Sequence, residues 1–493
     1  MVSSRCGADA GFVTDRKRQS TATSNFGAGA RESHDASGFY ERFRPPELST
    51  DDTVLTPNPV VEPFVHGDSR FMDSVVDGSV ALVVTSPPYF AGKQYEEELE
   101  REGVPSSYLE FLQMLTDVFA ECVRKLEPGG RIAVNVANLG RKPYRSLSAD
   151  VIRILEHDLG LLLRGELIWQ KGEGASGSCA WGSFRGATNP VLRDISERII
   201  VASKGRFDRA RTPRQRAAAG LPHNSTVMTD DFLLSTLDIW SMPTESAKRV
   251  GHPAPFPVEL PEQLIRLYTF ENDLVLDPFM GSGSSLVAAA RLGRRYVGYD
   301  LDPDYVQIAR GRVSAALASQ LAGEAPGADE VSSDAVIDAV TEGKSASRLA
   351  EEVVTAAGFT ITARKQRVRG TGATVSLVAT DALGTQWLFD IAGLFTSRHG
   401  GMLNNDAVWR ALGKAHAIRG KLPATPYVLL TTHLPKRSTE GATALRAAGP
   451  NAFFDAIEML SPASRARLAT YGRGDHAATP TLGFWTEAEL AAR

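Results

Sequence analysis

Short unbroken runs of apolar residues recur along the first two thirds of the chain, separated by segments whose apolar residues return every third or fourth position. A run such as 80–84 is typical of a strand buried on both faces of a sheet, whereas the spacing within 108–126 is typical of an amphipathic helix. Strands that alternate with helices form mostly parallel, doubly wound sheets. The pattern therefore predicts an α/β fold.

The same periodicities place the individual elements. Strands are expected at residues 60–65, 80–85, 131–136, 166–169, 197–203, 274–277 and 295–300. Helices are expected at residues 70–76, 108–126, 150–159, 259–270 and 286–292. Ligands of such sheets bind outside the carboxyl ends of the strands, so the residues that follow each strand are the first candidates for a site.

The apolar run 80–84 ends in Thr85 and then in Ser86, Pro87, Pro88 and Tyr89. Prolines fix φ and donate no N–H, which leaves the Ser86 hydroxyl and the backbone carbonyls as rigid hydrogen-bond acceptors. Two such acceptors would draw the amine of a nucleobase towards a tetrahedral nitrogen that can attack a methyl group, while Tyr89 stacks on the extruded base. The alternative is a proline-rich surface turn or a ligand for a partner domain.

Glycines follow the apolar strand 274–277, at positions 281 and 283, where the chain turns into a helix. Glycines at such a turn let the backbone approach a ligand closely. Leu286 stands where a dinucleotide fingerprint has its third glycine, which argues against a nicotinamide enzyme. Asp300 ends the next strand and is well placed for ribose hydroxyls. Asp68 follows the first strand and either contacts a cofactor or caps the helix at 70–76.

The segment 85–89 resembles the catalytic motif of the DNA amino-methyltransferases, and the resemblance extends over about residues 60–315. It implies a Rossmann-like, S-adenosylmethionine-dependent methyltransferase sheet that transfers methyl to N4 of cytosine or N6 of adenine. Because the catalytic motif precedes the glycine turn, as in the family's β arrangement, strand 274–277 should lie beside strand 80–85. Serine at position 86 resembles the N4-cytosine branch. The resemblance assigns cofactor contacts to Asp68, His252, Asp277, Phe279, Gly281, Gly283 and Asp300.

Two segments are candidates for DNA contact. Residues 172–194 are rich in small residues and carry Trp181 and Arg185, which suits a loop that stacks on bases, or equally a flexible hairpin. A basic run in 203–216 favours phosphate contact over a merely solvated basic face. Its cations are Lys204, Arg206, Arg209, Arg211, Arg214 and Arg216. The resemblance puts the target-recognition segment at about 205–245.

Composition sets the remaining limits. The net charge of −4 does not by itself indicate a nucleic-acid-binding protein, so a DNA surface must be local. The three cysteines are scattered, which predicts neither disulfides nor a metal site. None of them follows a proline, which excludes carbon-5 cytosine methylation. Without a membrane span or signal core, we expect a cytoplasmic, nucleoid-associated protein whose partners are double-stranded DNA and a cognate restriction endonuclease.

At 493 residues the chain is long enough for more than one domain. We expect a disordered tail at 1–50, a methyltransferase domain at 51–318, a linker at 319–345 and a smaller α/β or α+β domain at 346–493. The helix, hairpin, helix and strand expected in that last domain resemble a restriction-endonuclease-like fold. Ala392 lies two residues after Asp390, at the position where that fold has a metal-site lysine. We therefore expect a domain without nuclease activity. A working nuclease is the alternative.

Overall fold

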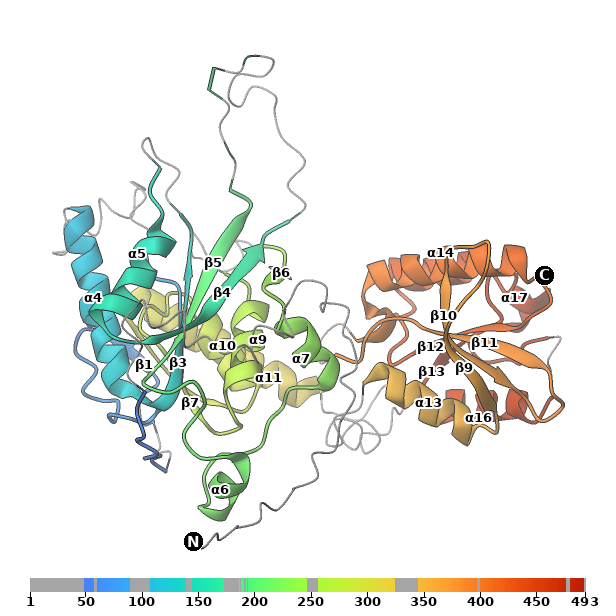
Figure 1. Ribbon diagram of the computed structural model, residues 1–493, viewed down its shortest axis with the longest axis horizontal. Coiled ribbons are helices and arrows are strands. Elements are labelled where there is room, and N and C mark those ends of the chain that lie inside the picture. Colours follow the sequence, from blue (N-terminus) through green and yellow to red (C-terminus); the bar gives the residue numbers. More distant parts are fainter. Residues whose placement is uncertain are drawn as a thin grey trace, which may run out of the picture. The chain divides into compact units, whose positions relative to one another are not determined.

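The structure is a computed structural model. It describes residues 48–56, 60–88, 107–138, 144–172, 186, 188–189, 192, 194–245, 256–323, 345–396, 400–475 and 479–491. These residues form two β-sheets, one of eight strands and one of five (Figure 1).

The larger sheet has the strand order β1-β8-β7-β2-β3-β5-β4-β6. Its strands are β1 (Phe64–His66), β2 (Val80–Thr85), β3 (Leu126–Val136), β4 (Leu162–Gln170), β5 (Ser196–Ser203), β6 (Ile239–Ser241), β7 (Leu274–Asp277) and β8 (Arg295–Asp300). Every neighbouring pair is parallel except the two that involve β5. The α/β prediction is confirmed, and β7 pairs with β2 as expected from the order of the motifs.

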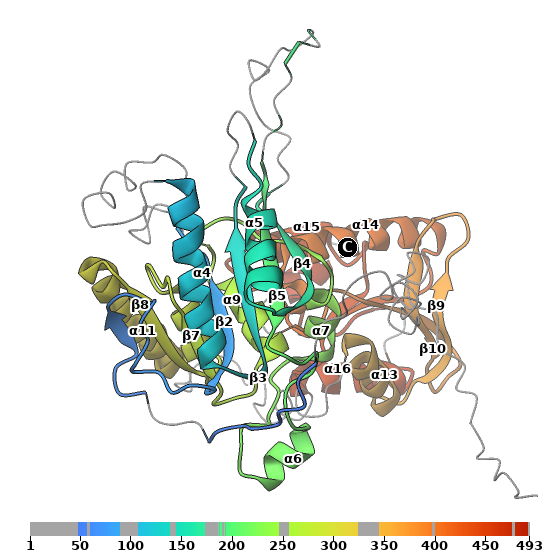
Figure 2. The same ribbon diagram turned by 60° about the vertical axis from the view of Figure 1, so that its left-hand side comes forward.

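Helices cover both faces of this sheet (Figures 1 and 2). One face packs on α4 (Tyr108–Lys125), α5 (Leu147–Arg153) and the π-helical turn Ile154–Asp158. The other packs on α9 (Glu259–Tyr268), α10 (Ser284–Arg291) and α11 (Pro303–Gly323). Side chains of strand β2 pack into the hydrophobic cores on both faces of the sheet because successive residues point to opposite sides. Val83 faces the first group of helices and Val84 faces the second. All six β2 residues are buried, which explains the unbroken apolar run.

Several boundaries differ from the sequence prediction. Strand β1 begins at Phe64, and residues 70–76 form turns instead of a helix. Strand β3 begins at Leu126, before the predicted start at residue 131. Helix α11 continues to Gly323, so the first residues of the predicted linker are helical. Two short helices, α6 (Pro213–Ala218) and α7 (Thr229–Ser235), lie in the predicted recognition segment.

The C-terminal part contains the five-stranded sheet, in the order β13-β12-β11-β10-β9. Its elements along the chain are α13 (Ala346–Ala356), β9 (Thr360–Arg367), β10 (Thr374–Thr380), β11 (Gln386–Ile391), the 3₁₀ turn Gly401–Leu403, α14 (Asn405–Lys421), β12 (Tyr427–Thr431), α15 (Glu440–Ala448), β13 (Asp455–Glu458), α16 (Pro462–Gly472) and α17 (Glu487–Ala491). The predicted hairpin is β10 and β11. Strand β9, a basic edge strand, was not expected.

Among the described residues, the helices are all too short or too polar to cross a lipid bilayer.

Candidate active site

The turn Ser86–Pro88 follows the central strand β2, which lies between β7 and β3. Pro87 is buried, and Ser86 and Pro88 are half-buried. The carboxyl ends of three parallel strands therefore meet at this turn, which is where ligands of open α/β sheets bind.

The glycine turn begins one strand away, directly after β7. Both glycines have left-handed backbone angles, with φ of 48° at Gly281 and 79° at Gly283. A Cβ atom at Gly283 would lie 2.7 Å from the Cβ of Ala309 in α11, so the turn and this helix approach each other too closely for any other residue. The Gly281 amide donates to Oδ2 of Asp300 at 2.9 Å, which joins the turn to the end of β8.

Asp300 and Asp68 lie at neighbouring strand ends. Strand β1 pairs with β8, and the Gly67 amide donates to the Asp300 carbonyl at 3.0 Å. Burial raises the pKa of the Asp300 carboxyl. Asp68 forms an ion pair with Arg70 at 2.6 Å and also accepts from its backbone N–H. The alternative role of Asp68 as a helix cap is wrong, because no helix follows it.

Asp277, at the end of β7, connects the two turns. Its Oδ1 accepts hydrogen bonds from the Thr85 hydroxyl at 2.7 Å and from the Phe279 amide at 3.1 Å. Thr85 immediately precedes Ser86, so one carboxylate oxygen fixes the start of both the catalytic turn and the glycine turn. Burial raises the pKa of Asp277 to about 6, since the donors around it are neutral.

Three carboxylates, Asp68, Asp277 and Asp300, thus stand at the ends of neighbouring strands around a glycine turn. An anionic pyrophosphate would be repelled here, whereas a ligand with a positive sulfonium and ammonium group would offset the buried charges of Asp277 and Asp300. The carboxylates also offer acceptors for ribose hydroxyls. This set of residues fits S-adenosylmethionine and does not fit a dinucleotide.

A second set of polar residues, which the sequence analysis missed, lies on the other side of Ser86. Nδ2 of Asn135 in β3 is 2.5 Å from Oε2 of Glu197 in β5 and 3.5 Å from the Ser86 Oγ. Lys171, just after β4, forms an ion pair with Glu197 at 2.5 Å. The signal was present in the sequence, since Asn135 and Glu197 are polar residues within predicted buried strands.

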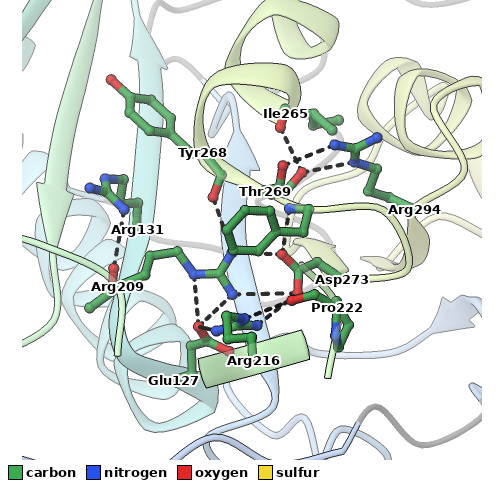
Figure 3. Close-up of polar contacts among 12 residues, drawn as sticks. Glu127, Arg131, Arg209, Arg216, Pro222, Ile265, Tyr268, Thr269, Asp273 and Arg294 are labelled. Carbon is green, nitrogen blue, oxygen red and sulfur yellow. Dashed lines mark hydrogen bonds and ion pairs between the residues drawn. The ribbon is translucent and has the colours of Figure 1, made fainter. Parts of the chain in front are cut away.

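The basic run begins at the amino end of β3, whereas the catalytic turn lies at the carboxyl ends of the strands. Figure 3 shows the contacts of Arg209 and Arg216 in this run. Strand β5 is antiparallel to β3, so residues after Ser203 emerge beside the amino end of β3, where Glu127 lies. Arg209 forms ion pairs with Glu127 at 2.5 Å and with Asp273 at 2.6 Å. Arg216 contacts the same two carboxylates at 3.3 Å each.

We call Glu127, Arg209, Arg216 and Asp273 the buried ion cluster. Arg216 is 1% exposed, and both guanidinium groups lie about 5 Å from the centre of the Phe270 ring. A guanidinium enclosed in this way has no face left for a DNA phosphate. The interpretation of Arg209 and Arg216 as phosphate contacts is therefore wrong, because the fold uses their charge to neutralise two buried acids.

The other cations of the basic run are less buried but lie at the same edge. Lys204 donates to the carbonyl of Leu126 at 2.7 Å, and Arg206 donates to that of Asp51 at 2.8 Å. Arg214 is exposed on α6, and Arg211 has a positive φ of 63°. Tyr89, Trp181, Arg185 and His252 lie outside the described residues.

In the C-terminal sheet, the carboxylate of Asp390 in β11 has a lysine partner that the sequence did not reveal. Lys414 of α14 reaches Asp390 Oδ2 at 2.8 Å, and the Ser376 hydroxyl donates to Oδ1 at 2.9 Å. A lysine from a helix thus occupies the space beside the acid, although Ala392 stands at the expected position. Within the described residues, no three His, Cys, Asp or Glu side chains gather to hold a metal ion.

Together, the mostly parallel sheet, the acidic glycine turn and the serine-proline turn on the adjacent strand suit a methyltransferase that acts on an amine. Residues 80–311 match the DNA methylase family N6_N4_Mtase, so this part of the chain is a DNA amino-methyltransferase domain. The predicted class of enzyme, a DNA methyltransferase with S-adenosylmethionine as cofactor, is thereby confirmed.

The chain is 29% identical over 268 residues to the Type II methyltransferase M.MjaI of Methanocaldococcus jannaschii, covering 48% of this chain and 86% of the relative. It is 28% identical over 272 residues to M.MthZI of Methanothermobacter thermautotrophicus, covering 51% and 76%. Among solved structures, a DNA modification methylase of Thermus thermophilus, crystallised with S-adenosyl-L-methionine, is 33% identical, with a TM-score of 0.38 and coverage of 51% and 92%.

Proposed function

We propose that this chain methylates N4 of cytosine at a specific site in double-stranded DNA, as the modifying partner of a restriction endonuclease. The observation that carries the proposal is the pairing of β2 with β7, together with the hydrogen bond from Thr85 to Asp277 at 2.7 Å. This contact supports a reaction in which a base at the serine-proline turn meets a methyl donor at the glycine turn. The relatives' designation as Type II methyltransferases supports the link to restriction.

The bound cofactor supplies an electrophilic methyl group on a sulfonium sulfur. Asp68, Asp277 and Asp300 would hold it with Phe279, Gly281 and Gly283, and His252 is a further candidate. Ser86 Oγ and the Pro87 carbonyl would accept hydrogen bonds from the two N–H groups of the target amine, with Pro88 keeping the turn rigid and Tyr89 stacking on the base. The amine nitrogen held at this turn would bond to the methyl carbon and release a proton, and the electron pair of the broken carbon–sulfur bond would leave with the cofactor.

Two measurements test this proposal. DNA methylated by the purified chain is digested to nucleosides, and N4-methylcytosine is the expected product; N6-methyladenine alone would establish the alternative branch of the family. The Ser86→Ala variant should transfer methyl at least a hundredfold more slowly with nearly unchanged affinity for S-adenosylmethionine, because Ser86 would contact the target amine and not the cofactor. Equal losses of rate and of cofactor affinity would contradict the assigned roles.

For the C-terminal domain we propose an endonuclease-like fold without nuclease activity, used for contact with DNA or a partner. The ion pair between Asp390 and Lys414 supports this, because a metal ion would have to displace the ammonium group from the carboxylate. Unmethylated plasmid DNA incubated with the chain and Mg²⁺ should stay intact. Cleavage that disappears in an Asp390→Asn variant would instead make the chain both methyltransferase and endonuclease.

A further inference from the structure

Beside the proposed catalytic turn, four polar side chains follow one another across neighbouring strand ends. They are Ser86 after β2, Asn135 in β3, Glu197 in β5 and Lys171 after β4. Asn135 is 2% exposed and Glu197 is 6% exposed. A buried acid next to the proposed catalytic serine is costly unless it is paired, and Glu197 is paired with both Asn135 and Lys171.

The orientation of the Asn135 amide follows from its neighbours. An ionised Glu197 can only accept hydrogen bonds, so the group that faces its Oε2 at 2.5 Å must be the Asn135 Nδ2. Lys171 contacts Oε1 of the same carboxylate at 2.5 Å and lies 5.4 Å from the centre of the Trp169 ring. The carboxylate is therefore held on two sides, and it prevents the amide from flipping.

Nδ2 of Asn135 also lies 3.5 Å from Ser86 Oγ, to which it can donate. This distance is at the long end for a hydrogen bond, and such contacts in unliganded enzymes shorten when substrate binds. A donor fixed at this position occupies one lone pair of Ser86 Oγ and limits where the hydroxyl proton can point. Such a donor would orient the Ser86 oxygen for an N–H of the target amine.

We infer that Asn135 is a positioning residue for Ser86, and that Glu197 holds Asn135 in its working orientation. The inference rests on the proposed role of Ser86 and deepens it. Lys171 has a supporting role, because it contacts Glu197 and not the serine. The three residues act on the rate of methyl transfer and not on cofactor binding, since the three carboxylates of the cofactor site lie on the other side of β2.

The test measures single-turnover methyl transfer, cofactor affinity by calorimetry, and thermal melting of the cofactor-free protein. Asn135→Ala should lower the transfer rate about tenfold to a hundredfold, as displacement of a reacting group by about 1 Å does, with cofactor Kd and the KM for DNA changed less than twofold. Glu197→Leu should cause a similar loss. The double variant should lose no more than about twofold beyond either single variant, because both changes release the same serine.

Glu197→Gln supplies the conservative comparison. Glutamine can still accept from Asn135 through its amide oxygen, and the half-exposed Lys171 can turn towards water, so the rate should stay within about threefold of the natural protein. Arg198→Ala is the matched control: Arg198 is the next residue in β5, and its ion pair with the exposed Glu166 is long, at 3.9 Å, so the rate of this variant should not change.

The outcomes separate this inference from the proposed function. If Ser86→Ala abolishes transfer while Asn135→Ala keeps the natural rate, the positioning role is wrong and the function stands. If Ser86→Ala itself transfers methyl normally, the proposed catalytic role fails first. Losses that simply add in the double variant, or an Asn135→Ala effect confined to melting temperature and cofactor Kd, would identify Asn135 and Glu197 as structural residues only.

Discussion

Buried carboxylates have different partners at the two ends of the strands of the larger sheet. At the amino ends of β3 and β7, Glu127 and Asp273 are each paired with two arginines. At the carboxyl end of β7, Asp277 is as deeply buried but is hydrogen-bonded by the neutral donors of Thr85 and Phe279. Buried charge is neutralised where its role is structural, and it lacks a cationic partner at Asp277, where we propose that the cationic methyl donor binds.

This difference shows why basic residues are an unsafe guide to a DNA surface. Arg209 and Arg216 belong to a run that resembles a phosphate-binding segment, yet both are paired with buried carboxylates inside the protein. The acids at the other edge, which carry no obvious signal for nucleic acid, surround the proposed methyl-donor site. Net charge near zero is consistent with this arrangement, because the largest local charges cancel within the fold.

The largest expected effect is on the buried ion cluster. Arg216→Met leaves Glu127 and Asp273 with one guanidinium between them and should lower the free energy of unfolding by about 3–5 kcal/mol. Thermal or urea unfolding of the variant measures this, with DNA affinity recorded below the transition. Unchanged stability together with weaker DNA binding would show instead that Arg216 contacts DNA phosphates, as the sequence suggested.

A smaller, pH-dependent effect is expected at Asp277. Its pKa of about 6 exceeds the ordinary value of 3.8, so the folded state holds its proton more tightly than the unfolded state. The stability that protonation provides is complete below about pH 4 and is lost as the pH rises through 6, at a total cost of up to about 3 kcal/mol. Asp277→Asn removes this cost, because the amide resembles the protonated carboxyl.

The cofactor-free Asp277→Asn variant should therefore melt at a higher temperature than the natural protein at pH 8, with an advantage about half as large at pH 5. Its affinity for S-adenosylmethionine should fall, since a carboxylate near the cation is lost. An advantage that does not change with pH would mean that Asp277 is already charged at no cost, and the contrast between the two edges would disappear.

Much of the methyltransferase fold follows from the sequence, because strands buried on both faces leave unbroken apolar runs. Strands β2, β7 and β8 and helix α4 lie where these runs and the helical spacing predict them. The proximity of Ser86 to the glycine turn followed from the order of the motifs. The turns at 70–76 were mistaken for a helix because their spacing is ambiguous over so short a stretch.

The remaining errors share one cause, which is that local sequence does not record long-range partners. Arg216 and Glu127 are 89 residues apart, and Asn135 and Glu197 are 62 apart. Lys414 meets Asp390 only because α14 packs on the C-terminal sheet, so a motif with fixed spacing could not reveal it. The antiparallel direction of β5, which carries the basic run to the amino edge, is likewise a property of the sheet and not of the run.

The smallest expected effect concerns Arg214, the exposed cation on α6 at the amino edge of the sheet. If this edge is structural, Arg214→Ala should change the free energy of unfolding by less than about 0.5 kcal/mol and leave DNA affinity unchanged. The salt dependence of DNA binding tests for a phosphate contact more directly, because each such contact contributes about 0.9 to the slope of log K against log salt. An unchanged slope is expected, since the proposed base-binding turn is at the opposite ends of the strands. A slope reduced by about one would show that DNA reaches the amino edge as well, and the division between a structural edge and a DNA-binding edge would then be wrong.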